Sequence, residues 1–281
     1  MDDVGIEYQT VLGYPPVEFV HLAADLGCHA ISMKASTGPY NAANPYGYGD
    51  FSFLEDVGGR RQMAAALRER AVAISLAEGF VVIPGADLTD DLASLDVMWE
   101  LGATRANVVT MDADLGRSFD QFAAFAEAAA DRGLQTTLEF AKSLALTDLP
   151  TAVAAVRWVG RPDFRLLIDT MHLVRSGSTA ADLAALDSAL FGYVQLSDST
   201  LEQRGAAYRD DSSDRLAPGA GELPLVDIML ALPAGLPVGA EVPMRSRAAA
   251  GASAQTCAQL AVEGARAVLA QVRAEREDVA E

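Results

Sequence analysis

The chain has 281 residues, 51% of them hydrophobic, and it carries 21 Lys and Arg against 39 Asp and Glu. The apolar content excludes wholesale disorder, and the net charge of −18 opposes binding to nucleic-acid phosphates. No run approaches the ~18 apolar residues of a membrane span, and the N-terminus lacks the features of a signal peptide. We therefore expect a cytoplasmic protein with neither a membrane nor a nucleic-acid partner, whose oligomeric state, including a homo-oligomer, stays open.

Short apolar or β-branched runs alternate with longer amphipathic stretches along the chain. The predicted strands are residues 4–11, 29–35, 71–78, 105–111, 136–140, 164–170, 193–197 and 237–242. The predicted helices are residues 15–27, 60–70, 91–102, 119–133, 149–160, 179–190, 223–233 and 254–277. Eight strands, each followed by a helix, predict an α/β fold: a single (β/α)8 barrel, or TIM barrel, formed by one domain over residues 1–281.

One connection departs from this regular pattern. Residues 36–59, after the second predicted strand, are rich in Gly, Pro, Asn and aromatic residues. Long loops in compact domains often act as active-site lids, and a surface loop without a role is the alternative. The aromatic residues favour a lid.

Four polar residues close consecutive predicted strands in the second half of the chain. They are Glu139, Asp169, Gln195 and Glu241. Because the parallel strands of a barrel end at one face, we expect three carboxylates and an amide oxygen to converge there. Two carboxylates about 4 Å apart repel by roughly 4 kcal/mol at an effective dielectric constant of about 20, and a divalent cation removes this conflict. The pattern predicts a metal site, with structural ion pairs at the barrel rim as the alternative.

Several strings between Leu138 and Pro243 resemble the second half of the xylose isomerase-like TIM-barrel superfamily, the fold group of the family 2 AP endonucleases. They are LEF, DTMHLVRSG, YVQLSDS, RLAPGAGELPL and EVP. The superfamily groups sugar and sugar-phosphate isomerases and epimerases, inosose and dehydroshikimate dehydratases, and endonuclease IV. In its D-tagatose 3-epimerase-like members, successive strands supply a Glu, an Asp, a His and a Glu to the metal. The resemblance implies that Glu139, Asp169, Gln195 and Glu241 are the ligands here.

The chain departs from the epimerase pattern at two points. Gln195 replaces the histidine, so the implied shell is all oxygen, which favours Mn2+ or Mg2+ over Zn2+ or Co2+. Lys142 and Ser143 stand where the epimerases carry a further substrate-binding acid, and this leaves 3-epimerisation itself open. Endonuclease IV requires a histidine-rich zinc site, whereas this chain has three histidines, so DNA repair is not expected.

The resemblance also implies roles for other residues. Glu139 and Glu241 would carry protons, and His172 of the D-x-x-H string would contact substrate or carry a proton. Arg215 of the R-x-x-P-G-x-G string is expected to bind substrate. Lys142, which departs from the family pattern, is a second substrate-binding candidate, with a solvated lysine as the alternative. Further candidates near strand ends are Lys34, Glu78 and Arg247 as mouth-lining residues and Asp198 as a residue that orients a neighbour.

We therefore expect a metal-dependent isomerase or epimerase that acts on a small keto-sugar, sugar phosphate or related polyol through an enediolate. A lyase that dehydrates a cyclic keto-polyol would use the same groups, because a β-hydroxyl can leave from the same intermediate. A carbohydrate-binding barrel without catalytic activity is the third hypothesis.

Overall fold

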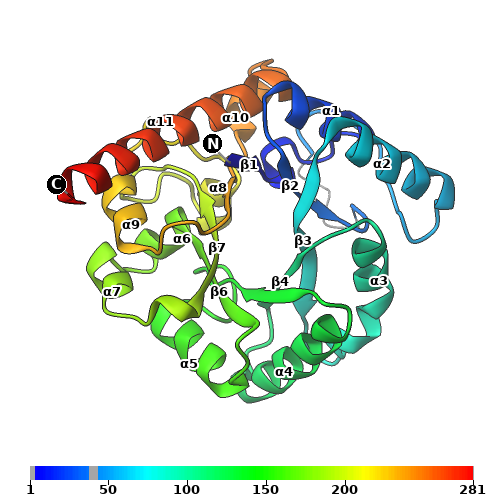
Figure 1. Cartoon of the computed structure of the whole chain (residues 1–281), viewed down its shortest axis with the longest axis horizontal. Helices are drawn as coiled ribbons and strands as arrows, with labels where there is room; N and C mark the ends of the chain where they lie inside the picture. Colours follow the sequence, from blue (N-terminus) through cyan, green and yellow to red (C-terminus); the bar gives the residue numbers. More distant parts are fainter. Residues whose placement is uncertain (1–3, 38–43, 281) are drawn as a thin grey trace.

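Eight parallel strands close into a barrel in the computed structural model, which describes residues 4–37 and 44–280 (Figure 1). The strands are β1 (Val4–Ile6), β2 (Ala30–Lys34), β3 (Ala73–Val82), β4 (Arg105–Thr110), β5 (Gln135–Leu138), β6 (Phe164–Asp169), β7 (Phe191–Leu196) and β8 (Val238–Ala240). Each strand pairs in parallel with the next, and β8 pairs with β1. The predicted TIM barrel is confirmed.

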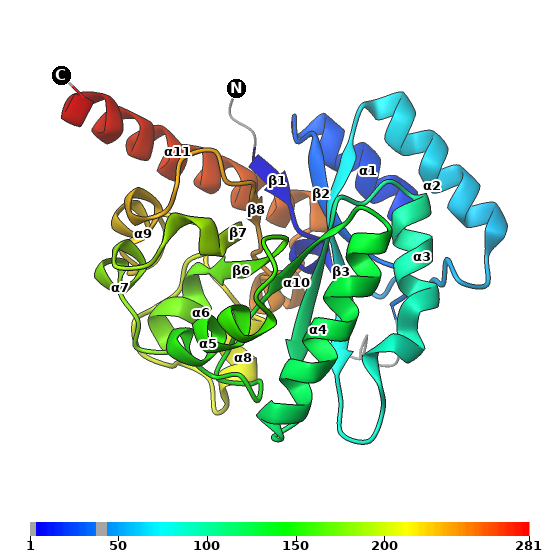
Figure 2. The ribbon, with the colours of Figure 1, turned by 60° about the horizontal axis from the view of Figure 1, so that its bottom comes forward.

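Helices surround the barrel, as Figures 1 and 2 show. They are α1 (Pro16–Asp25), α2 (Val57–Arg70), α3 (Leu92–Glu100), α4 (Leu115–Asp131), α5 (Leu149–Val159), α6 (Thr170–Arg175), α7 (Ala180–Ala184), α9 (Leu225–Ala231) and α11 (Ala254–Ala280). Two short helices, α8 (Tyr208–Ser212) and α10 (Arg245–Ala249), lie in the connections that follow β7 and β8. Among the described residues, no helix has both the length and the apolar character to cross a membrane.

The structure shifts the bounds of several predicted elements. β1 ends at Ile6, and a 3-10 helix at Tyr8–Val11 replaces the rest of the first predicted strand. β6 ends at Asp169, because the Asp169 side chain caps α6 by accepting a hydrogen bond from the His172 N–H. The helix predicted over residues 179–190 is divided into α7 and a 3-10 helix at Ser188–Leu190.

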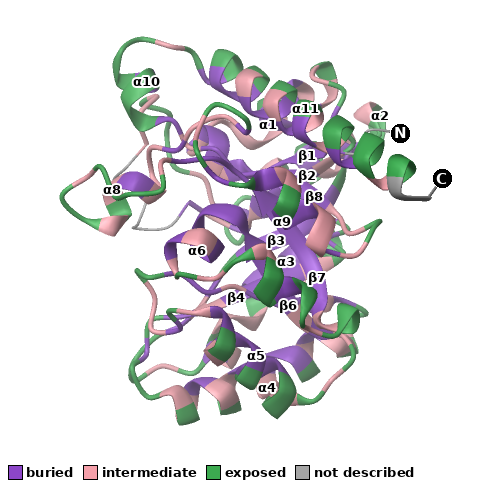
Figure 3. Ribbon diagram, turned by 90° about the vertical axis from the view of Figure 1, so that its left-hand side faces the viewer, coloured by how far each residue is buried: buried purple, intermediate pink, exposed green. Residues whose placement is uncertain are grey.

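The barrel interior is polar towards the carboxyl ends of the strands. A small apolar cluster of Leu76, Leu167 and Tyr193 is separate from the large core between strands and helices. The Tyr193 hydroxyl crosses the barrel to Ser75 Oγ at 3.0 Å and donates to Glu7 Oε1 at 2.7 Å. A Cβ atom on Gly239 would lie 1.5 Å from that Glu7 oxygen, so the glycine in β8 makes room for a buried carboxyl group. The strands are thus buried within the helical shell (Figure 3) and still enclose polar side chains.

Candidate metal centre and cavity

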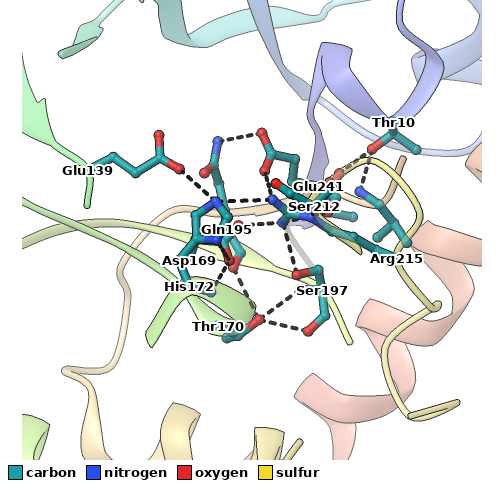
Figure 4. Close-up of polar contacts among 12 residues, drawn as sticks. Thr10, Glu139, Asp169, Thr170, His172, Gln195, Ser197, Ser212, Arg215 and Glu241 are labelled. Carbon is teal, nitrogen blue, oxygen red and sulfur yellow. Dashed lines mark hydrogen bonds and ion pairs between the residues drawn. The ribbon is translucent and has the colours of Figure 1, made fainter. Parts of the chain in front are cut away.

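The four residues that close the predicted strands lie at the carboxyl ends of β5 to β8. Asp169 is the last residue of β6 and Gln195 lies one residue before the end of β7. Glu139 and Glu241 directly follow β5 and β8, and their backbone N–H groups donate to Val108 and Leu196 of the neighbouring strands. Their side chains extend into one region together with Arg215 and His172 (Figure 4). The shared face expected from the sequence therefore exists.

Three residues offer ligand atoms for a metal ion at short mutual distances. One ligand atom each from Glu139, Asp169 and His172 lies within 4.8 Å of the other two. His172 joins the two acids because it sits in the first turn of α6, where its N–H donates to Asp169 Oδ1 at 2.8 Å. Two carboxylates and an imidazole are suitable donors for a divalent transition metal. These residues could hold such an ion.

The hydrogen bonds of His172 define its protonation state. A guanidinium can only donate, so His172 Nε2, which lies 3.3 Å from Arg215 NH2, acts as the acceptor. The proton is then on Nδ1, which lies 2.6 Å from the Tyr208 hydroxyl. Burial, assisted by Arg215 and opposed by Asp169, lowers the pKa of His172 to about 4. At neutral pH the imidazole is therefore uncharged, and a metal ion at this cluster would take the place of Arg215 as the partner of Nε2.

Arg215 is a buried cation between two of the four predicted ligands. Its guanidinium lies 2.5 Å from Asp169 Oδ2 and 3.0 Å from Glu241 Oε2. Burial alone would raise the pKa of Asp169, but Arg215 and His172 bring it below the usual value. The two acids likewise raise the pKa of Arg215 against the effect of burial. Much of the charge of Arg215 is thus neutralised within the protein.

Glu139 and Glu241 have an increased affinity for protons. Burial, together with the charges of Asp169 and Glu78, raises the pKa of Glu139 to about 8, although Asn107 Nδ2 donates to its Oε2 at 2.8 Å. Burial also raises the pKa of Glu241 well above its usual value, despite the ion pair with Arg215. A carboxylate with this environment gains from a nearby cation as well as from a proton.

Gln195 contacts acids from two other strands. Its Nε2 donates to Glu78 Oε1 at 3.1 Å, across the barrel, and to Glu241 Oε1 at 3.2 Å. These two acceptors fix the orientation of the amide. Gln195 Oε1 is buried and has no hydrogen-bond partner among the described residues. An unpaired buried oxygen fits the role of a metal ligand, and the four-residue ligand set stays a prediction.

A cavity of about 590 Å3 opens above these groups. Its lining includes Lys34, Glu78, Asn107, Glu139, His172, Arg215 and Glu241. Pro45 and Tyr46 also line it, from the segment predicted as a lid, whereas residues 38–43 of that segment lie outside the described residues. Two other candidates, Lys142 and Arg247, are exposed and are not among the described residues that line the cavity.

Asp198 organises the turn that precedes α9. Its carboxylate accepts four backbone N–H hydrogen bonds, from Ser199, Gly219, Gly221 and Leu223, at 2.8 to 3.1 Å. The backbone donors of this Gly-rich segment therefore serve an internal carboxylate. A Cβ atom on Gly221 would lie 2.3 Å from Asp198 Oδ1, so only glycine fits at this position beside the carboxylate.

Two residues that contact the site were missed in the sequence. Asn107 lies on the inner face of β4, two residues before Val109, which also lines the cavity. Side chains two residues apart on a strand share a face, and this alternation could have identified Asn107 from the sequence. Tyr208 lies in α8, in a connection without apolar periodicity, so the sequence carries no local signal for its bond to His172.

Several solved structures share this fold. The chain matches a xylose isomerase-like TIM barrel/4-hydroxyphenylpyruvate dioxygenase fusion protein at 19% identity and a TM-score of 0.77, covering 98% of this chain and 44% of that protein. It matches the IOLI protein, solved with a bound zinc atom, at 16% identity and a TM-score of 0.76, over 96% and 99% of the two chains.

Two further matches are enzymes by name. D-psicose 3-epimerase from Clostridium cellulolyticum H10 is 16% identical with a TM-score of 0.67, over 96% of this chain and 98% of the epimerase. The probable 3-DHS dehydratase AsbF of Bacillus anthracis is 11% identical with a TM-score of 0.68, over 93% and 97%. At these identities the likeness shows the fold alone.

No curated protein matches the chain. A family model described as xylose isomerase-like TIM barrel matches residues 14–261, which is most of the sequence. The members of this family are mostly metal-dependent enzymes, and the family binds small sugar substrates. The chain therefore belongs to the xylose isomerase-like TIM-barrel family.

Proposed function

We propose that this protein is a divalent-metal-dependent enzyme that moves a proton next to a carbonyl group of a small keto-sugar or related polyol. The observation that carries the proposal is the cluster of Glu139, Asp169 and His172, of which Glu139 and His172 line the cavity. Isomerisation or epimerisation through an enediolate is the leading reaction. The enzyme names among the structural neighbours, a 3-epimerase and a probable dehydratase, agree with this class of chemistry.

The two candidate ligand sets share Glu139 and Asp169. The cluster found in the structure adds His172, whereas the sequence-based set adds Gln195 and Glu241. An imidazole ligand suits Zn2+ or Mn2+, and the all-oxygen set suits Mn2+ or Mg2+, so Mn2+ is compatible with both. When bound, such an ion polarises a carbonyl oxygen and stabilises the negative charge that develops as a proton leaves the neighbouring carbon.

Glu139 is the best-placed base. It lines the cavity, and Asn107 is its one hydrogen-bond donor among the described residues. A cation beside it would lower its raised pKa and keep it ionised, ready to take a proton from a substrate carbon. Glu241 lines the same cavity from β8 and would return a proton from another side, which epimerisation requires.

Dehydration is the second candidate, and the unequal environments of the two acids favour it. Glu241 is bound by Arg215 and by Gln195, whereas Glu139 pairs with no Arg or Lys among the described residues and lies 3.6 Å from Nε2 of the uncharged His172. One free base is enough if it removes the proton from carbon and then passes that proton to the β-hydroxyl, which leaves as water. Epimerisation at one carbon requires a proton donor on the opposite face as well.

The decisive experiment combines metal content with solvent exchange. Protein purified without a metal-affinity step is analysed by mass spectrometry, then stripped and reloaded with Mn2+, Mg2+ or Zn2+. D-Fructose, D-tagatose, 2-keto-myo-inositol and two anionic ketones, D-fructose 6-phosphate and 3-dehydroshikimate, are incubated with the loaded protein in D2O, and deuterium uptake and water loss are followed by NMR. We expect about one ion per chain and metal-dependent exchange or dehydration.

Glu139→Gln is the matching variant, and Glu69→Gln, on the exposed face of α2, is its control. The first should lower turnover at least about 100-fold with an unchanged fold, and the second should leave it unaltered. Binding of sugars without exchange, in the presence of every metal, would contradict the enzyme and favour a carbohydrate-binding barrel.

A further inference from the structure

Only two of the 21 Lys and Arg residues are lysines, Lys34 and Lys142, and the others are arginines. Both lysines lie at the carboxyl-terminal side of strands, β2 and β5 respectively. Lys34 lines the cavity and is partly buried, whereas Lys142 is exposed. A generic surface cation in this protein is an arginine, so Lys34 requires an explanation from its own surroundings.

Most of the other cations around the cavity are engaged. Arg215 is paired with Asp169 and Glu241, and Arg245 lies 3.7 Å from Asp210. Lys34 and Arg209 line the cavity without an ion pair or side-chain hydrogen bond within residues 4–37 and 44–280. The cavity therefore presents two cations whose charge is available to a ligand.

The backbone around Lys34 directs it towards the cavity. It ends β2 and pairs in register with Glu78, whose partner across the barrel is Gln195. Its aliphatic chain lies beside Gly79, where a Cβ would be 3.9 Å from Lys34 Cγ, and Gly79 has a φ of +103° that favours glycine. The charge of Lys34 also acts on Glu78, because it opposes the rise of the Glu78 pKa. Lys34 thus stands between the buried acids and the open cavity.

Because of the negative net charge of the protein, an anionic ligand would need a cation such as Lys34 at the cavity. At a net charge of −18, the protein as a whole repels anions, and an anionic substrate needs local positive charge at the cavity to bind. A neutral sugar has no such requirement, because hydroxyl groups and a metal ion suffice to bind it.

We infer that the substrate carries an anionic group, a carboxylate or a phosphate, which binds Lys34 on the cavity wall with Arg209 at the rim. The inference rests on the proposed function and narrows its substrate class. Arg215 and Lys142, which were expected to bind substrate, are not part of this anion site, because Arg215 is neutralised by acids and Lys142 lies outside the described cavity lining.

The test compares two ligands that differ in charge and lack a reactive carbonyl. Quinate is a cyclic polyol with a carboxylate, myo-inositol is a neutral cyclic polyol, and inorganic phosphate represents the other anion. Binding of each to the metal-loaded protein is measured by titration calorimetry, so the readout does not depend on turnover. We expect quinate or phosphate to bind at least about tenfold more tightly than myo-inositol.

Lys34→Met should remove that preference, with about a tenfold or greater loss of affinity for the preferred anion and little change for myo-inositol. Lys34→Arg should restore part of it. Arg68→Met, at an exposed position of α2, removes the same charge away from the cavity and should leave binding unchanged.

Three results would overturn the inference: equal binding of quinate and myo-inositol with no binding of phosphate, an unchanged preference in Lys34→Met, or loss of the preference in Lys142→Met alone. Failure of the proposed function looks different. In that case the anion preference would persist while no ketone exchanges deuterium or loses water.

Discussion

Two acids at the carboxyl-terminal face of the barrel, the buried Asp198 and the partly buried Glu139, have opposite surroundings. Asp198, two residues after β7, receives four backbone N–H hydrogen bonds, and Glu139, one residue after β5, receives one from the Asn107 side chain. The pKa of Glu139 is raised to about 8. A carboxylate that accepts hydrogen bonds from several fixed donors is satisfied and stabilises the local backbone. A carboxylate with few donors can still bind a cation or a proton.

Asp169 is intermediate between these two acids. One of its oxygens caps α6, and the other is paired with Arg215. It therefore has a structural task and at the same time belongs to the candidate metal cluster. We therefore expect a metal ion to recover stability after the loss of an internal partner at the Glu139, Asp169 and His172 cluster, and not at Asp198.

The largest effect on stability is expected for Arg215→Met. This change leaves Asp169 and Glu241 buried without their cation, which should destabilise the metal-free protein by about 3–5 kcal/mol. Mn2+ or Zn2+ should recover part of the loss, as measured by denaturant unfolding with and without metal. Arg175→Met is the matched control, because Arg175 is equally buried and pairs with Asp211 at 2.9 Å, away from the cluster. Equal recovery in both variants would contradict a metal effect specific to the site.

A smaller loss is expected for Asp198→Ala. It leaves four backbone donors without their acceptor, and partial access of water to Gly219 and Gly221 limits the cost to about 2–4 kcal/mol. Added metal should not reverse this loss, in contrast to Arg215→Met. Asp198→Asn keeps one acceptor oxygen, so its loss of stability should be about half of the loss in Asp198→Ala. A change below about 0.5 kcal/mol in the alanine variant would show that the turn does not depend on this carboxylate.

The sequence contains much of this arrangement because its signals are local. Apolar runs predicted eight strands, and parallel strands end at one face, so Glu139, Asp169 and Glu241 were expected together. The Arg215 ion pairs depend on how the chain returns after β7, and the partner of His172, Tyr208, lies in that same irregular connection. No periodicity encodes such a path. His172 was expected near substrate, and its place within the candidate metal cluster follows from the capping of α6 by Asp169.

A further expected effect is a pH dependence of the metal-free protein. The raised pKa of Glu139 and that of Glu7, both about 8, mean that the folded state holds protons that the unfolded state releases near pH 4.5. Stability is therefore greatest at low pH with respect to these groups and falls as pH rises towards about 8. His172, with its pKa lowered to about 4 from 6.5, acts in the opposite direction only below pH 6.5.

The midpoint of thermal unfolding should thus decrease between pH 6.5 and 8 and then level off with respect to these two acids. Glu139→Gln should reduce the slope, and saturating Mn2+ should reduce it further, because bound metal replaces the proton. A slope that is identical in Glu139→Gln and in the unaltered protein would mean that another group causes it.

The two ends of the connection after β7 lie next to each other. Asp198 and Leu216 form an antiparallel bridge, with N···O distances of 3.1 and 2.9 Å, and close residues 199–215 into a loop whose base is fixed. When the ends of a loop are already joined, each doubling of its length costs only about 0.6 kcal/mol in closure entropy. This loop carries Tyr208 and Arg209 beside the cavity, so insertions there can remodel ligand selectivity while the barrel keeps its stability. It is the natural segment to randomise when the protein is evolved towards a new substrate.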